Sequence, residues 1–281
     1  MSWRLGIRHT TGYRYDDDVV SSYNEARLTP QTGPGQFTLE ARIETSPVAL
    51  QHRYVDYWGT QVTAFDVQQP HSALEVTSNS VVDTSPERAR PEQAPGWAQL
   101  RGEDLRDRFA EMLAATPLTG CDGQMQEAAR TAAAGLAPRD AVLAVTDQVF
   151  RQVSYVPGAT GVRTSATQAW ELGQGVCQDI AHVSLALLRG LGIPARYCSG
   201  YLHPDPDAAV GAEVTGESHA WVEVWLGGWW AYDPTNQVPV GERHVLVAQG
   251  RDYTDVTPLK GIYSGRGSHA LGVQVALTRM L

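Results

Sequence analysis

Several features that define common protein classes are scarce or missing in this chain. Cysteine occurs only three times in 281 residues, which is too few for a disulfide framework and leaves at least one free thiol. Lysine occurs once, at Lys260, and arginine supplies the other 21 of the 22 basic residues. The net charge is −9 and no basic run occurs, so the chain lacks the electrostatic footprint that nucleic-acid binding normally needs. No stretch of 18 apolar residues occurs, and the first residues contain no apolar segment typical of a secretory signal. We therefore expect a cytoplasmic protein that binds neither nucleic acid nor membrane.

The composition that remains is that of a folded chain, with 42% hydrophobic and 19% charged residues. Before residue 84, apolar and polar residues alternate in runs that are broken by Pro, Gly, Asn and Asp, which is typical of strands. The clearest runs cover residues 4–19, 37–45 and 62–69. Nothing in this part brings a nucleophile next to a base, so we predict an N-terminal β-sandwich-like domain over 1–84 without catalytic residues.

The segment 85–144 is expected to form a linker and a helical connection. Its first twelve residues, 85–96, contain three Pro and two Glu and little that is apolar. Apolar residues at helical spacing then predict a series of helices. The expected helices cover residues 103–115, 138–150, 165–173 and 177–192.

Strands return after the last of these helices. Residues 193–202 predict one strand, and residues 218–233 predict a β-hairpin. The tail, 241–281, alternates again and is expected to add edge strands as a C-terminal β extension. The chain is therefore predicted to be an α+β protein, with a core over 145–240 in which helices pack on an antiparallel sheet.

Cys177 lies where a thiol becomes a nucleophile. It occupies the first turn of the expected helix 177–192. The positive end of the helix dipole and the unpaired backbone N–H groups stabilise a thiolate there. The glycines that precede it, Gly173 and Gly175, leave room for a substrate to approach. The competing interpretation is a small buried apolar side chain.

A thiolate nucleophile needs a base, and the base needs an orienting group. The predicted hairpin holds both candidates, His219 in its first strand and Asp233 at the end of its second. A three-residue turn would pair Trp225 with Trp229. Trp221 then pairs with Asp233, which makes His219 a diagonal neighbour of Asp233 on the same face. We favour this turn over a two-residue one because it also gathers the apolar residues of the hairpin on one face.

These segments resemble the bacterial transglutaminase-like family, a papain-related group of cysteine acyl-transfer domains. The resemblance rests on GVCQDIAH (175–182), GYL (200–202), SHAWVEVWLGGWWAYDPTN (218–236) and RDYTDVTPLKGIYSG (251–265). The first domain is similar to the β-rich domain often fused in that family, through HTTGYRYDDDVVSSYNEARLTP (9–30). One departure is Thr60, where the family usually has Asn.

The resemblance implies a papain-like, transglutaminase-like core that works without a cofactor. It makes Cys177 the nucleophile, His219 the base and Asp233 the orienting carboxylate. The implied reaction is acyl transfer on an amide bond of a peptide or protein through a thioester. We expect hydrolysis of a peptide or isopeptide bond rather than transamidation of protein glutamine, because no acidic cluster suggests the calcium site of a regulated cross-linking enzyme.

Other residues are candidates for parts of the same site. The backbone N–H of Cys177 and the hydroxyl of Tyr155 are candidate oxyanion donors. Trp221 and Trp225 are candidate walls of an acyl-binding cleft, because four of the eight tryptophans lie between 221 and 230.

Two other interpretations stay open. Cys177 with His182, and Cys198 with His203, repeat a spacing that can indicate zinc. Residues five apart on a helix lie about 140° apart around its axis, so we expect no metal site there. A catalytically silent fold used as a binding module would also suit the β domain and the tryptophan-rich hairpin. Labelling of Cys177 no faster than that of Cys198 would favour that second interpretation.

Overall fold

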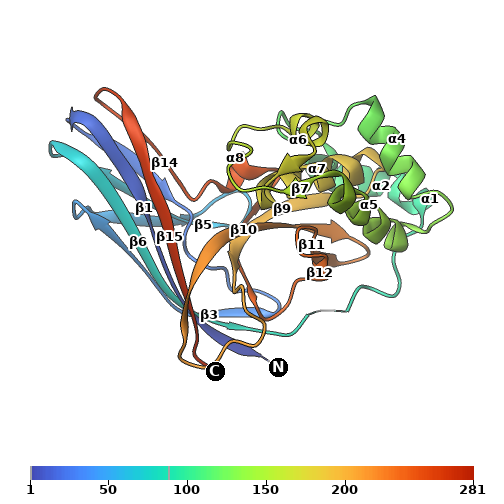
Figure 1. The fold of residues 1–281 in the computed structure, drawn as a ribbon, viewed down its shortest axis with the longest axis horizontal. Helices are drawn as coiled ribbons and strands as arrows, with labels where there is room; N and C mark the ends of the chain where they lie inside the picture. The colour runs from blue at the N-terminus through green and yellow to red at the C-terminus, as the bar shows by residue number, and fades with distance from the viewer. Residues whose placement is uncertain (1, 88) are drawn as a thin grey trace.

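The computed structural model describes residues 2–87 and 89–281, which form a β region and a mixed helical region side by side (Figure 1). The β region contains β1 (Trp3–Val19), β2 (Ser22–Ala26), β3 (Gln36–Ser46), β4 (Gln51–Val55), β5 (Gln61–Val67), β6 (His71–Thr84), β14 (Leu259–Tyr263) and β15 (Ser268–Arg279). The α+β class predicted from the sequence is confirmed.

The mixed region contains all the helices and the remaining strands of the described residues. The helices are α1 (Trp97–Leu100), α2 (Glu103–Arg108), α3 (Ala110–Leu113), α4 (Gly123–Ala132), α5 (Pro138–Gln152), α6 (Ala166–Leu172), α7 (Cys177–Gly190) and α8 (Tyr253–Val256). The strands are β7 (Ser154–Tyr155), β8 (Gln174–Gly175), β9 (Ala195–Leu202), β10 (Glu213–Trp225), β11 (Trp229–Asp233), β12 (Val238–Pro239) and β13 (His244–Gly250).

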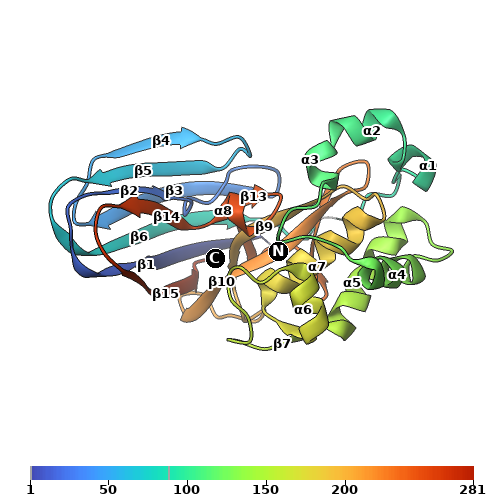
Figure 2. The same cartoon turned by 90° about the horizontal axis from the view of Figure 1, so that it is seen from above.

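Two sheets build the N-terminal sandwich. One is four-stranded, in the order β14-β2-β5-β4, and the other is the β15-β1-β6-β3 part of a nine-stranded sheet (Figure 2). Apolar side chains from both sheets fill the space between them, as expected when alternating strands each turn one face inward. This core consists of Tyr15, Val19, Ala26, Leu28, Ile43, Phe65, Val67, Leu74, Val76 and Leu259.

The two regions share strands and are not joined by a simple linker. The nine-stranded sheet runs from β12 and β11 through β10 and β15 to β1, β6 and β3. Leu5 and Ile7 of β1 lie in the core of the mixed region, whereas Tyr15 and Val19 of the same strand lie in the sandwich core. One long strand therefore stabilises both cores.

Helix α7 lies at the centre of the mixed region and packs against β10 and β9. Ile180, Val183 and Leu187 are buried, and so is most of the rest of the helix. An apolar helix of this kind is stable only when other elements cover it on several sides. The position of its first residue, Cys177, is therefore set by packing along its whole length.

Some predictions need correction. The helix expected over 103–115 is broken, because Phe109 leaves the helical conformation (φ −115°, ψ 25°) and separates α2 from α3. Its ring packs on Trp225 and Trp229 of the hairpin. The tail was expected to add edge strands, and β13 and β14 do lie at sheet edges. β15, however, is an interior strand that pairs with β1 and β10. The division of the chain at residues 84, 144 and 240 stays a prediction.

Among the described residues, no helix is long and apolar enough to cross a membrane.

Candidate active site

Cys177 is the first residue of α7, and its thiol is free and half-buried. Asp179, in the first turn, holds the helix start in place. Its Oδ2 accepts hydrogen bonds from the backbone N–H of Val176 at 2.8 Å and from the hydroxyl of Thr160 at 2.6 Å. A carboxylate that binds the N–H groups of the first turn stabilises a helix terminus and fixes the direction in which the chain enters it.

Gly175 does not have the role expected from the sequence. It is buried, and a Cβ at this position would meet the Asp179 side chain at 2.7 Å. The glycine therefore makes room for Asp179 beneath the helix start, and it does not open a path for substrate.

Tyr155 is held close to the nucleophile by a short pair of parallel strands. It lies opposite Gly175 in the β7–β8 ladder, and the next residue, Val156, donates its N–H to the carbonyl of Gly175 at 2.8 Å. The Tyr155 hydroxyl donates to Oε2 of Glu217 at 3.5 Å. Burial, followed by the charges of Cys177 and Glu217, raises the pKa of Tyr155 to about 12. The hydroxyl thus keeps its proton at neutral pH and can donate it in a hydrogen bond.

The hairpin has the three-residue turn predicted from the sequence. Trp225 pairs with Trp229, and Gly227 adopts a left-handed conformation with φ +87°. His219 and Asp233 consequently share a face, and Nε2 of His219 donates to Oδ2 of Asp233 at 2.7 Å. Both side chains are shielded from water, with 9% and 0% of their surfaces exposed.

Five hydrogen bonds hold the Asp233 carboxylate. Its Oδ1 accepts from the backbone N–H groups of Thr235 and Asn236, at 2.9 and 3.2 Å, in the kind of turn that Asp commonly initiates. Its Oδ2 accepts from His219, from Nδ2 of Asn236 at 2.7 Å and from Nε2 of His244 at 3.2 Å. Burial alone would raise the pKa of Asp233, but the bonds from the two histidines hold this pKa far below its ordinary value.

His219 links the carboxylate to the sulfur. Burial lowers its pKa, but hydrogen bonds to Asp233 and to the side chain of Cys177, with the charges of both, outweigh burial and raise this pKa to about 10. The imidazole is therefore protonated at neutral pH and faces the thiol. A positive charge beside the sulfur and a helix N-terminus beneath it both stabilise a thiolate. This arrangement can perform nucleophilic catalysis with a proton donor already in place.

Of the two tryptophans predicted to wall an acyl cleft, one is buried against the triad histidine and the other lies far along the hairpin. Trp221 is 1% exposed, and its ring packs against His219 and His244, at centroid distances of 6.2 and 5.5 Å. Trp225 lies six residues beyond His219, about 20 Å along the strand, where it packs on Phe109. Neither side chain is therefore positioned to bind an acyl group next to Cys177.

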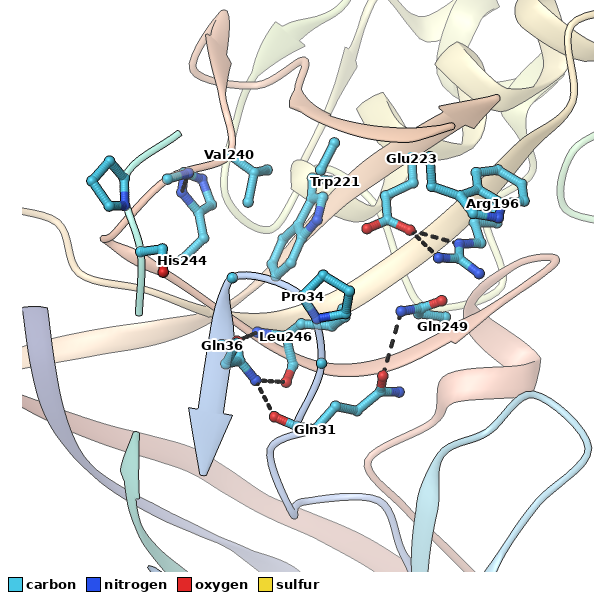
Figure 3. Close-up of a pocket in the computed structure, with 17 residues that line it drawn as sticks. Gln31, Pro34, Gln36, Arg196, Trp221, Glu223, Val240, His244, Leu246 and Gln249 are labelled. Atoms are coloured by element: carbon cyan, nitrogen blue, oxygen red, sulfur yellow. Dashed lines mark hydrogen bonds and ion pairs between the residues drawn. The ribbon is translucent and has the colours of Figure 1, made fainter. Parts of the chain in front are cut away.

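Trp221 does line a partly open cavity of about 230 Å³ (Figure 3). Gln31 and residues 33–36 of the β region form one wall of this cavity, and Glu223, Arg196 and His244 of the mixed region form another. The triad residues are not among its lining residues, so Trp221 and His244 separate the cavity from the reacting groups.

A metal ion is the other chemistry that this geometry could suggest. Among the described residues, His219, Asp233 and His244 form a group whose donor atoms lie within 4.8 Å of one another. However, the amide of Asn236 donates a proton to the same oxygen to which both histidines are bonded. An ion at that point would face an N–H group instead of a ligand atom. The group therefore fits a hydrogen-bonded network better than a metal centre.

The histidine of the first Cys/His spacing has a structural role. His182 is fully buried, and its Nε2 accepts a hydrogen bond from the backbone N–H of Tyr253 at 3.2 Å. Burial lowers the pKa of His182 to about 4, so its ring is neutral.

Sequence reasoning placed the three central residues but missed their supports. Asp179 had a local signal, since an acidic residue at the third position of a helix is typical of a capping interaction. Asn236 lies in the DPTN segment, three residues after Asp233. His244 had no signal, because it comes from a different strand and meets Asp233 only in the folded chain.

Comparisons with known families and proteins agree with the fold. Residues 126–234 match the family model of the transglutaminase-like superfamily, and residues 5–83 match that of the bacterial transglutaminase-like N-terminal region. An uncharacterised protein of Mycobacterium leprae is 48% identical over 279 residues, which cover 99% of each chain. An uncharacterised protein of Mycobacterium tuberculosis is 33% identical over 303 residues, covering 97% of this chain and 91% of the relative.

Two further similarities concern proteins with more specific descriptions. The crystal structure of a candidate cysteine protease from Cytophaga hutchinsonii superposes with a TM-score of 0.78 at 22% identity, covering 100% of this chain and 91% of that one. This similarity shows the fold. A protein-glutamine gamma-glutamyltransferase of Pseudomonas aeruginosa is 35% identical over 88 residues, which are 29% of this chain and 13% of that protein.

Proposed function

Since the chain belongs to the transglutaminase-like family, we propose that it is a cysteine-dependent enzyme that hydrolyses amide bonds of peptides or proteins. The observation that supports this proposal is the buried connection from Cys177 through His219 to Asp233. The imidazole is only 9% exposed, a carboxylate orients it at 2.7 Å, and the side chain of Cys177 contributes to its raised pKa.

In the proposed reaction the Cys177 thiolate attacks the amide carbonyl, forming a C–S bond and a tetrahedral oxyanion. His219 gives its proton to the departing nitrogen as the C–N bond breaks, which leaves a thioester and a neutral imidazole. The imidazole then takes a proton from water as the water oxygen attacks the thioester. Loss of the C–S bond releases a carboxylic acid and restores the thiolate and the imidazolium.

The oxyanion needs hydrogen-bond donors at the helix start. We propose the backbone N–H of Cys177, which belongs to the first turn of α7 and has no acceptor within the helix. The Tyr155 hydroxyl, held beside the nucleophile by β7 and β8, is proposed as the second donor.

Transamidation is the second candidate. The local similarity to a protein-glutamine gamma-glutamyltransferase favours it, because an amine can resolve the same thioester. We place hydrolysis first because Cys177 is only partly buried, so water has access to the acyl-enzyme. We further propose a cytoplasmic site of action, which cell fractionation followed by detection with a specific antibody would test.

The experiment compares the parent with Cys177→Ala on a peptide library, measuring peptide cleavage, ammonia release and incorporation of a labelled primary amine. We expect cleavage that falls by at least about 10³-fold in the variant, as for the loss of other catalytic nucleophiles. Amine incorporation in excess of cleavage would instead favour transamidation.

Iodoacetamide labelling provides the control within the same molecule. Cys198 is fully buried on β9, and burial raises the pKa of its thiol well above the ordinary value. We expect Cys177 to be alkylated much faster than Cys198 at neutral pH. Equal rates, or activity unchanged in Cys177→Ala, would contradict the proposed function.

A further inference from the structure

A second histidine is bonded to the triad carboxylate. His244, the first residue of β13, has 2% of its side chain exposed, and its Nε2 lies 3.2 Å from Oδ2 of Asp233. The same oxygen accepts the bond from His219. His219 and His244 therefore approach one carboxylate oxygen from two strands that are not neighbours in the sheet.

The contacts of His244 determine which nitrogen bears its proton. The backbone N–H of Gly241 donates to Nδ1 at 3.3 Å, so Nδ1 is an acceptor. A neutral imidazole has one donor and one acceptor nitrogen, and Nε2 must then hold the proton that it donates to Asp233. Burial is the largest influence on the pKa of His244 and lowers it, and the positive charges of His219 and Arg243 act in the same direction. The hydrogen bond to Asp233 and its negative charge act in the opposite direction, but the pKa of His244 stays below its ordinary value. His244 is thus a neutral donor, whereas His219 is charged.

Residues of the β region hold His244 in this position. The side chain of Gln36 bonds to both backbone groups of Leu246 on the same strand, accepting from its N–H at 2.7 Å and donating to its carbonyl at 2.8 Å (Figure 3). The hydroxyl of Thr84 donates to the carbonyl of Glu242 at 2.6 Å, two residues before His244. The ring of Trp221 packs against His244 from the other side. The imidazole therefore has little freedom to turn away.

We propose that His244 is a positioning residue that fixes the orientation of Asp233, and through it that of His219. The inference rests on the proposed function. Rotation about the Cβ–Cγ bond of Asp233 would carry Oδ2 away from His219. The hydrogen bond from His244, which lies on a separate strand, opposes that rotation. The orienting carboxylate of a cysteine or serine triad must hold its imidazole at a defined angle for proton transfer. Groups that orient metal-ligating residues in other enzymes change metal affinity or activity by about 10–100-fold when they are removed, and we expect an effect of similar size here.

The test uses His244→Leu, which removes the donor, and His244→Gln, whose amide nitrogen lies at about the reach of Nε2 and restores one. Purified full-length variants are compared for peptide cleavage, for the rate of Cys177 alkylation and for unfolding by urea. We expect His244→Leu to lower kcat by about 10–100-fold with little change in KM. We expect His244→Gln to stay within about threefold of the parent.

His71→Leu is the matched control, since His71 is also buried and is hydrogen-bonded through Nε2, to Ser22 of the β region. It should lose stability but keep the parental kcat. If His244→Leu fails to fold, His244→Asn replaces it, because the shorter side chain brings its amide nitrogen to the place of Nδ1 and not of Nε2. His244→Asn should then lower kcat by about 10–100-fold, the result expected for His244→Leu.

The outcomes separate the two proposals. A parent with a reactive Cys177 and a His244→Leu or His244→Asn variant of parental kcat would overturn the role of His244 alone. The role of His244 would also be overturned if His244→Gln lost as much kcat as His244→Leu or His244→Asn at equal stability. Restoring a hydrogen-bond donor to Asp233 would then have restored no activity. A parent without cleavage whose Cys177 is no more reactive than Cys198 would overturn the proposed function itself.

Discussion

His219 combines two properties that seldom occur in one side chain, because it is buried and yet protonated at neutral pH. Burial disfavours the charged imidazole, and only the carboxylate of Asp233 and the sulfur of Cys177 reverse that effect. The charge is therefore a property of the three residues together. Changing one of them should alter the protonation of the others.

This coupling predicts a pH dependence of stability. The pKa of His219 is raised from 6.5 to about 10 in the folded chain, so its protonation stabilises the fold fully below pH 6.5. This stabilisation is lost as the pH rises from about 6.5 to about 10, and we expect it to be on the order of a few kcal/mol. In Asp233→Asn the charged partner of His219 is gone, so burial dominates and the pKa of His219 falls. The stability lost between about pH 6.5 and pH 10 should then be much smaller than in the parent.

Urea unfolding of the parent and of Asp233→Asn at pH 6, 8 and 10 measures this difference. Groups outside the triad that titrate in the alkaline range are the same in both proteins, and their contributions cancel in the comparison. Parallel stability curves for the two proteins would show that Asp233 does not hold the proton on His219.

The start of α7 is the element on which the nucleophile depends. A helix dipole stabilises a thiolate only if the chain enters the helix in a fixed direction. Asp179 secures that entry from inside the protein, where it is 1% exposed and binds Val176 and Thr160. Burial is the largest influence on its pKa and raises it, although its hydrogen bonds act in the opposite direction.

Asp179→Ala should therefore destabilise the protein and disturb the nucleophile. We expect a loss of about 1–2 kcal/mol in the free energy of unfolding, because the partly buried N–H of Val176 would lose its capping partner. The rate of Cys177 alkylation should fall in the same variant. Urea unfolding and iodoacetamide labelling measure the two effects.

Asp140→Ala is the control for that experiment. Asp140 also occupies the third position of its helix, α5, but its side chain is 53% exposed and pairs with Arg90. An exposed ion pair contributes at most about 1 kcal/mol. If both variants lose the same stability and Cys177 keeps its parental rate in both, Asp179 has no special role at the nucleophile.

At the scale of the whole molecule, the β region and the mixed region share a sheet and core residues. β15 pairs with β1 on one side and with residues 213–216 of β10 on the other, and β14 pairs with β2. Leu5 and Ile7 of β1 and Val82 of β6 lie in the core that surrounds α7. Removing the first 88 residues would leave β14 without its partner β2, take from β15 its longer pairing with β1, and expose that core.

A chain of residues 89–281 should consequently fail to fold by itself. We expect it to be insoluble or to be degraded rapidly in limited proteolysis, whereas the full chain should unfold in a single cooperative transition. Differential scanning calorimetry of the full chain provides the matching measurement. Two separate transitions, together with a soluble and protease-resistant fragment, would contradict this prediction.

The sequence alone was sufficient for the parts of this protein that depend on local periodicity. The 3.6-residue spacing behind Cys177 predicted α7, and alternation in the hairpin predicted the strands, the turn and the shared face of His219 and Asp233. A one-residue change of register would have moved Asp233 to the opposite face, so the pattern of apolar residues determined the central geometry of the site.

Tertiary structure decided what no local pattern contains. His244 and Asp233 meet because β13 and β11 are brought together through other strands, and β15 becomes an interior strand because β1 and β10 both pair with it. Trp221 is buried because the β region covers the face of the sheet on which it lies. Such contacts depend on long-range packing between segments far apart in the chain, and spacing within a segment therefore does not reveal them.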